Sequence, residues 1–520
     1  MQKITSEHLT ALLEERHKNN PYAKLSNIPK PDSFKDIKIA TKRVKEAITN
    51  KETITIVGDY DVDGIVSTTI MVDFFKTISY PINYIIPNRF KHGYGLSPKI
   101  VDQIEEGLVI TVDNGISAYE ASVLLKEKNI DLIITDHHTV GDKIPLALAI
   151  INTKQKDCNF PFKDICGAQI AWYFCAAIKK ELDLNVDMSS FMDILCIAII
   201  ADIMPMNSLN YTMVKFGLQK FKNSKRPALL QLKQSLNKTV YTSDDVGFFI
   251  APKLNSAGRL EDASIALEFL LSPDTFSAQN NLDYLNELNN QRKVLQNEIN
   301  NQAVRQVNKN DKVIVVWNEN WHEGVIGIVA SKLCHAFKRP AFVFSITNGI
   351  AKGSARANSE INLHTLISTT SDLLLGFGGH KNAAGMALKE ENLEEFRKNL
   401  NLNINNYDEE LYINTKTLGE LDVSSVSMDF LNVIERYEPY GQDNLKPIFT
   451  VSNANIIKKE IFGKDKSHLK LYLESFGFYY EAILFGETKL EGKSVSFIVS
   501  LNKNEFRGRC NTQFLIQEIL

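Results

Sequence analysis

The sequence lacks the features of a secreted, disulfide-stabilised or membrane-spanning protein. It has only six cysteines in 520 residues, and none forms a CxxC pair or a zinc-ligand spacing. Several lie inside apolar runs, so we expect buried free thiols. No apolar run approaches the ~20 residues that a membrane helix needs. The N-terminal stretch carries acids and has no apolar core, so it does not resemble a secretion signal. These absences favour a cytoplasmic protein without a membrane segment.

A large excess of charge of either sign is also absent. Lysine and arginine number 59 against 62 aspartates and glutamates, which gives a net charge of -3. The overall charge therefore gives no argument for binding nucleic acid, and any basic surface must be local. The clearest local stretch runs from Lys215 to Lys238 and contains no acid. It indicates either a binding surface or a pair of helices with a solvated face.

The length and the hydrophobic pattern predict several domains. From about residue 54, short β-branched runs alternate with amphipathic stretches, which is typical of βαβ units around a parallel sheet. The apolar run before Pro205 predicts a buried helix. A polar stretch with spaced leucines then predicts a long helix between two domains, and the short strands near the C-terminus predict a small OB-like barrel. The predicted parts are an N-terminal extension (1–40), a parallel-sheet α/β domain (41–270), a connecting helix (271–311), a second α/β domain (312–407) and an OB-like β-barrel (408–520).

Acidic residues and histidines recur where the apolar runs of the first domain end. The residues are Asp59, Asp61, Asp63, Asp113, Asp136, His137, His138 and Asp202. Residues just beyond the carboxyl ends of neighbouring parallel strands share one crevice. Carboxylates crowded there repel one another, so we expect bound cations. Aspartate and histidine without thiolate favour Mn²⁺ or Mg²⁺, and the ligands suffice for two ions that hydrolyse a phosphorus ester. A single aspartate after a strand is often only a turn residue, but four such motifs in order are harder to explain by turns.

The motifs "DYDVDG", "VDNG", "DHH" and "ADIMP" resemble the four metal motifs of the DHH phosphoesterase superfamily. The resemblance implies two ions of Mn²⁺ or Mg²⁺, with Asp113 bridging them and His138 facing the scissile phosphate as an electrophile or acid. By position, Asp59 and Asp136 would orient a ligand or an imidazole. The implied metal ligands are Asp61, Asp63, Asp113, His137 and Asp202.

Further motifs resemble the RecJ family of single-strand-specific exonucleases. They are "NSAGRLEDA", "WHEGVIGIVASKL", "GSARA", "GFGGHKNAAG" and "EPYGQDNLKP". The resemblance implies 5′ to 3′ degradation of single-stranded DNA to mononucleotides in recombination and repair, by a DHH domain, a DHH-associated domain and an OB-like domain. Arg89, Ser354 and Arg356 would hold a 5′ phosphate. Arg259 would contact a backbone phosphate or guard the entrance against duplex, and His380 would lie near the phosphate chain.

The chain departs from the family pattern at two places. "GSARA" has alanine where a second glycine is usual, and Leu445 stands where proline is commoner. These departures concern recognition of the 5′ end and the C-terminal domain, and both lie outside the metal motifs. Independently of them, two alternative functions stay open. One is a DHH phosphodiesterase that acts on short oligoribonucleotides, cyclic dinucleotides or pyrophosphate, and the other is a non-catalytic replication scaffold of the same ancestry. For the exonuclease we expect a monomer that works with a single-strand-binding protein and a helicase.

Overall fold

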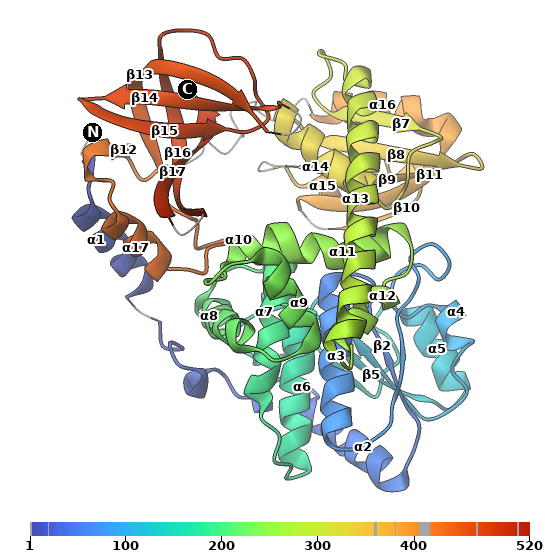
Figure 1. Cartoon of the computed structure of the whole chain (residues 1–520). Coiled ribbons are helices and arrows are strands. Elements are labelled where there is room, and N and C mark those ends of the chain that lie inside the picture. Colours follow the sequence, from blue (N-terminus) through green and yellow to red (C-terminus); the bar gives the residue numbers. More distant parts are fainter. Residues whose placement is uncertain are drawn as a thin grey trace.

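The computed structural model arranges the chain as three bodies, two of them joined by one long helix (Figure 1). It describes residues 3–18, 20–357, 361–379, 381–404, 417–463, 466–506 and 509–520, and for residues 505, 506, 509 and 510 only the backbone. Among the described helices, none combines the length and the apolar character that crossing a bilayer requires.

The first body is built on a five-stranded parallel sheet in the order β3-β2-β4-β5-β6. Its strands are β2 (Ile54–Val57), β3 (Asn83–Ile85), β4 (Leu108–Val112), β5 (Asp131–Thr135) and β6 (Ala149–Ile151). Alternate residues of a strand face opposite sides, so Ile110 packs with one layer of helices and Val109 with the other. The first layer contains α2 (Ile37–Asn50), α3 (Val62–Thr77) and α6 (Gly167–Glu181), and the second contains α4 (Pro98–Val101) and α5 (Tyr119–Glu127).

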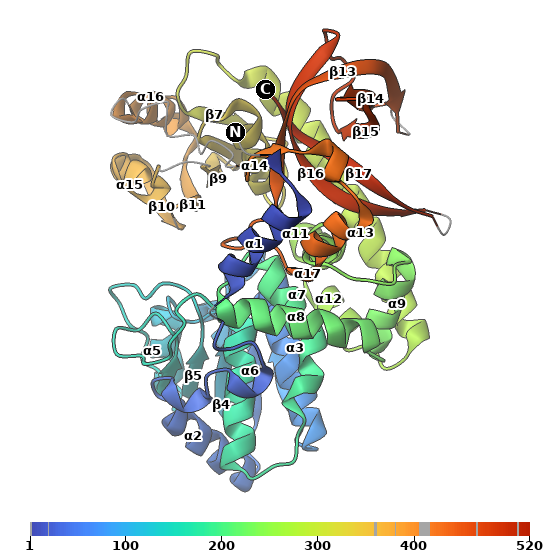
Figure 2. The ribbon, with the colours of Figure 1, turned by 90° about the vertical axis from the view of Figure 1, so that its left-hand side faces the viewer.

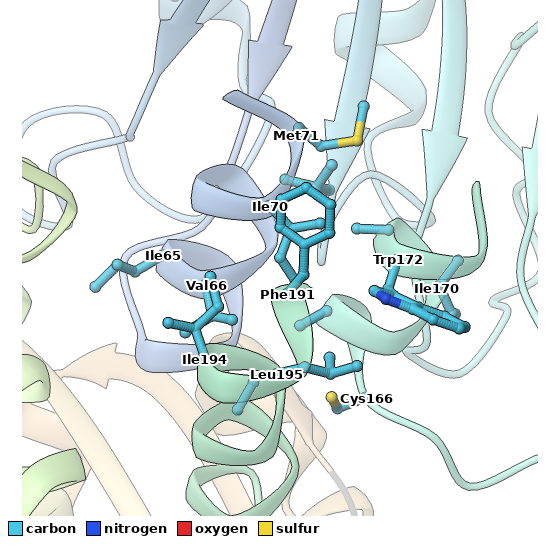
Figure 3. Close-up of a cluster of buried hydrophobic side chains, with 14 of the residues drawn as sticks. Ile65, Val66, Ile70, Met71, Cys166, Ile170, Trp172, Phe191, Ile194 and Leu195 are labelled. Carbon is cyan, nitrogen blue, oxygen red and sulfur yellow. The ribbon is translucent and has the colours of Figure 1, made fainter. Parts of the chain in front are cut away.

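Further helices extend this body beyond the sheet. They are α7 (Met192–Ala201), α8 (Ser208–Asn223), α9 (Pro227–Leu236), α10 (Ser243–Asp245), the π-helical turn η4 (Val246–Ile250), α11 (Ala251–Leu260) and α12 (Ser264–Leu270). The apolar run before Pro205 forms α7, as predicted. Ile70 of α3 and Leu195 of α7 lie in a buried apolar cluster with Trp172 of α6 (Figure 3). This core holds α7 firmly beside α3, so the residue that follows α7 has a fixed position.

The helix α13 (Thr275–Gln306) connects the first body to the second, as Figure 1 shows. The second body has a sheet in the order β10-β11-β9-β8-β7, in which only β7 and β8 are parallel neighbours. Its strands are β7 (Ile314–Asn318), β8 (Ala341–Thr347), β9 (Ile350–Arg356), β10 (Leu374–Gly379) and β11 (Ala383–Lys389). The helix α14 (Ile326–Phe337) packs on one face of this sheet, and α15 (Leu363–Ser368) and α16 (Leu393–Asn403) pack on the other.

The third body is a β-barrel of the predicted OB type, closed by pairing between β13 and β16. Its long strands are β13 (Ile448–Phe462), β14 (His468–Ser475), β15 (Phe478–Leu484), β16 (Ser494–Phe506) and β17 (Arg509–Ile519), with α17 (Met428–Arg436) packed below them. The N-terminal end of the chain also joins this body, as Figure 2 shows. The strand β1 (Lys3–Ile4) pairs with β12 (Glu420–Leu421), and α1 (Ser6–His17) buries Leu9 and Leu13 in the core of the barrel domain.

Candidate metal centre

The acidic residues and histidines that follow the strands meet at one edge of the first sheet. Asp59 and Asp61 come after β2, and Asp113 comes directly after β4. Asp136 and His137 come directly after β5. These strands are parallel neighbours, so their carboxyl ends lie together. The topology therefore brings well-separated stretches of the chain into one site.

Hydrogen bonds to Asp61 and Asp63 fix the connection between β2 and α3. Asp61 is the N-cap of α3, and its Oδ1 accepts from the backbone N–H groups of Asp63 (2.9 Å) and Gly64 (3.2 Å). The carboxylate of Asp63 accepts from the first two N–H groups of α6, those of Gly167 (2.6 Å) and Ala168 (2.8 Å). Since a helix N-terminus favours a negative charge, α6 stabilises this buried carboxylate.

His137 lies at the centre of a first group of possible metal ligands. Its Nε2 is 3.3 Å from Oδ1 of Asp113, 3.6 Å from Oδ2 of Asp202 and 3.8 Å from Oδ2 of Asp63. Ligand atoms of Asp63, His137 and Asp202 all lie within 4.8 Å of one another. Burial lowers the pKa of His137 to about 4, so the ring is neutral and a nitrogen can bind a cation.

Asp59, Asp61 and Asp113 form a second group, whose oxygens also lie within 4.8 Å of one another. Burial raises the pKa of Asp59 and Asp113 well above the usual range, and the neighbouring carboxylates raise it further. The sequence suggested that Asp59 orients a ligand. Its position beside Asp61 makes it a further candidate ligand.

Several buried oxygens in this cluster have no hydrogen-bond donor within the described ranges. They are Oδ1 of Asp59, Oδ1 of Asp113 and Oδ2 of Asp202. A desolvated carboxylate without a donor is unfavourable, and a bound cation compensates it. A donor set of carboxylate oxygens with imidazole and no thiolate suits Mn²⁺ and Mg²⁺. The residues present therefore fit two such ions.

Asp113 has the geometry of a shared ligand. Its oxygens group with Asp59 and Asp61 on one side and with His137 on the other. Its φ is 62°, a left-handed conformation that is uncommon for a residue other than glycine. A Cβ at Gly167 would lie 2.4 Å from Oδ1 of Asp113. Glycine at 167 thus leaves the space in which this strained aspartate sits, and such strain is typical of functional sites.

Asp136 holds His138 by two hydrogen bonds to one oxygen. Oδ1 of Asp136 accepts from the backbone N–H of His138 (3.0 Å) and lies 2.7 Å from Nδ1 of its ring. Oδ2 accepts from the N–H of Ile116 (2.8 Å). Burial alone would lower the pKa of His138, but the hydrogen bond and charge of Asp136 raise it to about 9. His138 therefore carries a proton near neutral pH, beside the candidate metal ligands.

A hydroxyl and a guanidinium converge in the second body, at the end of β9. Nη1 of Arg356 donates to Oγ of Ser354 (3.0 Å). The first turn of α14 lies against both, because a Cβ at Gly327 would come 3.0 Å from Oγ of Ser354 and 3.2 Å from Nη2 of Arg356. A helix N-terminus, a hydroxyl and an arginine together make a site suited to a phosphate.

Arg259 and Arg89 lie near one another, within electrostatic range of both the carboxylates and Arg356. Nη1 of Arg259 donates to the carbonyl of Gly324 in the second body (3.2 Å). Burial lowers the pKa of Arg259 to about 10, and the positive charges of Arg89 and Arg356 add to this effect. The guanidinium of Arg89 lies 5.0 Å from the ring of Tyr60. The sequence-predicted arginines are thus close enough to repel one another, which favours an anion between them.

Arg292 joins this cluster, although the sequence reasoning did not name it. It lies on α13, is 9% exposed, and donates to the side-chain oxygens of Asn289 (3.0 Å) and Gln296 (2.7 Å). No carboxylate forms an ion pair with it within the described residues. Only its spacing in the sequence indicates that Arg292 is buried. It lies four residues after Leu288, on the buried face of α13. The other expected residue, His380, lies outside the described residues.

Comparisons with known proteins agree with this architecture. The chain matches the DHH family N-terminal domain over residues 53–199, the DHHA1 domain over 310–406 and the RecJ OB domain over 419–518. A single-stranded-DNA-specific exonuclease RecJ from Haemophilus influenzae is 31% identical, and the match covers 95% of this chain and 92% of that protein. The Bacillus subtilis protein of the same name is 34% identical over 94% of this chain, which spans 64% of its length.

Solved structures give the same result. The crystal structure of RecJ from Thermus thermophilus in complex with Mn²⁺ superposes with a TM-score of 0.85 at 26% identity, covering 99% of this chain and 76% of that one. The Mg²⁺ complex of RecJ from the same organism gives 0.79 at 25% identity, with 99% and 75% covered. Sequence, fold and the gathered carboxylates agree, and the chain belongs to the RecJ family of single-stranded-DNA-specific exonucleases.

Proposed function

We propose that this chain removes mononucleotides one at a time from the 5′ end of single-stranded DNA, by hydrolysis in a two-metal site. The observation that carries the proposal is the convergence of five aspartates and His137 at one sheet edge, opposite a phosphate site in the second body. The names of the relatives support the substrate class. The direction of digestion and the products are inferred from the geometry and the family resemblance.

We assign the following roles to the side chains of the site. Asp61, Asp63, Asp113, His137 and Asp202 would hold two ions of Mn²⁺ or Mg²⁺, with Asp59 as a further ligand and Asp136 orienting His138. The ions, when bound, lower the pKa of a water molecule and neutralise phosphate charge. His138 would hold its proton towards the scissile phosphate and donate a hydrogen bond to it.

The 5′ end would be recognised by Arg356, Ser354 and Arg89. A terminal phosphate carries more charge than an internal one, and a guanidinium with a hydroxyl matches its oxygens. Arg259 bridges the two bodies from a partly buried position, so it would contact the first backbone phosphates and narrow the entrance against duplex. The barrel would hold the DNA strand further along by stacking bases on its exposed aromatic side chains.

In the cell we propose a cytoplasmic monomer that acts in DNA recombination and repair. A helicase would supply single strands, and a single-strand-binding protein would be a further partner. These roles follow from the substrate, because an enzyme that digests single strands needs a process that exposes them.

The first experiment follows product length. Wild-type protein with Mn²⁺ and a long 5′-phosphorylated single strand should release mononucleotides from the 5′ end, whereas Asp113→Asn should lose at least 100-fold in rate, because a shared ligand charge is removed (~3 kcal/mol). Rapid cleavage of dinucleotides with intact long strands would favour the short-substrate phosphodiesterase. If no phosphodiester is cleaved, the result would favour the non-catalytic replication scaffold.

A second experiment tests recognition of the 5′ end. Arg356→Ala should reduce the preference for a 5′ phosphate over a 5′ hydroxyl by roughly tenfold, because a charge-assisted bidentate contact is lost. The preference is measured as the ratio of initial rates on the two strands. Lys398→Ala is the matched control, since Lys398 is exposed on α16, on the opposite face of the same sheet. An unchanged ratio in Arg356→Ala would refute the assignment.

A further inference from the structure

A cavity of about 350 Å³ lies beside the metal centre, at the junction of the first and second bodies. It is bounded by the end of α7, the turn η4, α11, α13 and the start of α14. Its walls include Ile203, Phe248, Pro252, Asn255, Arg292 and Ile328. Most of the wall is therefore apolar, in a site that is otherwise lined by charges.

Ile203 enters this cavity from a strained position. It follows Asp202 at the C-terminus of α7, where its N–H bonds to the carbonyl of Ile200 and that of Met204 bonds to Ile199. This is the helix ending in which a left-handed glycine is usual. Ile203 has φ 54°, although a β-branched side chain is unfavourable there. Its side chain is also 70% exposed, so core packing does not explain why isoleucine stands in place of glycine.

Phe248 is the second large apolar group at the cavity. It lies in the π-helical turn η4, which precedes α11. Single π-turns of this kind occur frequently at functional sites. Phe248 is 73% exposed, so, as with Ile203, most of its apolar surface is not covered by the described part of the chain.

The cavity lies between the two places where phosphates are expected. Ile203 directly follows the candidate ligand Asp202, and Ile328 directly follows Gly327, which lies against Ser354 and Arg356. If the proposed function holds, the scissile phosphate is at the first place and the 5′ phosphate at the second. The group that joins them is the nucleoside at the 5′ end.

We propose that this cavity receives the 5′-terminal base, which stacks on Phe248 and packs against Ile203. Every base has an apolar face, so such a pocket accepts all four. Three polar side chains line the wall, and each makes a hydrogen bond within the protein. Oδ1 of Asn255 accepts from the N–H of Val62 (3.3 Å), Arg259 donates to the carbonyl of Gly324 (3.2 Å), and Arg292 is held by Asn289 and Gln296. This deepens the proposed function, on which it rests, by naming the subsite that positions the terminal nucleotide.

The test uses two 5′-phosphorylated strands, identical except that one has an abasic residue at its 5′ end. In both, methylene replaces the bridging 3′ oxygen of the first linkage, so the Mn²⁺-loaded protein binds them without cutting. Wild-type protein should bind the abasic strand roughly tenfold more weakly, which is the usual effect of one stacked base. Phe248→Ala should bind the two strands equally.

Phe249→Ala is the matched control, because Phe249 is the next residue, is 52% exposed and does not line the cavity. It should discriminate between the strands as wild type does. Equal binding of both strands by wild-type protein, or undiminished discrimination in Phe248→Ala, overturns the proposal. If the protein discriminates between the two strands in binding but does not cleave an ordinary strand, the proposed function is wrong and the base pocket is still supported.

A second variant separates binding from folding. Ile203→Gly should have a thermal midpoint at or above that of wild type, because glycine adopts φ 54° without strain. It should nevertheless lose several-fold in affinity for the strand that carries the terminal base, and less for the abasic strand. An equal loss for both strands would show that Ile203 does not contact the base.

Discussion

At the scale of single residues, the metal centre depends on close packing as much as on charge. Asp113 adopts a left-handed conformation, and Gly167 leaves the space for its carboxylate. Gly167→Ala should therefore displace this carboxylate and weaken Mn²⁺ binding at least tenfold, since a shift of about 1 Å in a site can cost 100-fold in activity. Calorimetric titration with Mn²⁺ measures the affinity.

Gly141→Ala is the control for that substitution, because a Cβ at Gly141 meets no atom within 4 Å. It should bind Mn²⁺ as wild type does. If Gly167→Ala also binds Mn²⁺ normally, the carboxylate of Asp113 has room to move and the packing argument is wrong.

The sequence predicts some residues of the site better than others, for a physical reason. Asp113 and His137 could be predicted because they follow buried strands, and the parallel sheet brings strand ends together. Arg292 and Ile203 could not, since their roles depend on how helices pack against one another. Arg292 belongs to a helix that the sequence suggests is mostly solvated, yet its own side chain is buried.

At the scale of elements, the order of elements was predictable and the placement of the first helix was not. The sequence indicates an N-terminal extension over residues 1–40 without indicating where it packs. In the structure, α1 packs with α17 and the barrel strands near the other end of the chain. The sequence of α1 indicates a buried face only through the pair Leu9 and Leu13, which lie four residues apart on one side of the helix. A contact between the two ends of the chain leaves no periodic pattern that would identify its partner.

This placement predicts that α1 stabilises the barrel domain. Leu13 is fully buried in the barrel core, whereas its neighbour Leu12 is 45% exposed. Leu13→Ala should reduce the free energy of unfolding of the barrel domain by about 3 kcal/mol, since a cavity replaces the side chain. Leu12→Ala should change it by less than about 0.5 kcal/mol. Urea unfolding followed by the fluorescence of barrel tyrosines compares them, and equal effects would contradict the packing of α1.

At the scale of the whole molecule, a small set of polar contacts fastens the barrel domain to the first body. The N–H of Met206 donates to the carbonyl of Gln442 (2.7 Å). Lys446 pairs with Asp244 (3.0 Å), and Oγ of Ser243 donates to Glu438 (3.2 Å). Met206 belongs to the loop that begins at Asp202. The junction therefore joins the barrel domain directly to the loop that carries a candidate metal ligand.

This junction should weaken as the pH rises. Burial raises the pKa of Glu438 from 4.5 to about 7, so between these values the folded protein keeps a proton that the unfolded chain has lost. Folding is therefore favoured less as the pH rises through this window, by up to about 3 kcal/mol. Glu438→Gln cannot ionise, so its thermal midpoint should exceed that of wild type at pH 8 and approach it at pH 5. Glu487→Gln, at an exposed carboxylate of the same domain, should follow wild type at both pH values. A midpoint difference for Glu438→Gln that is the same at pH 5 and pH 8 would exclude ionisation of Glu438 as the cause.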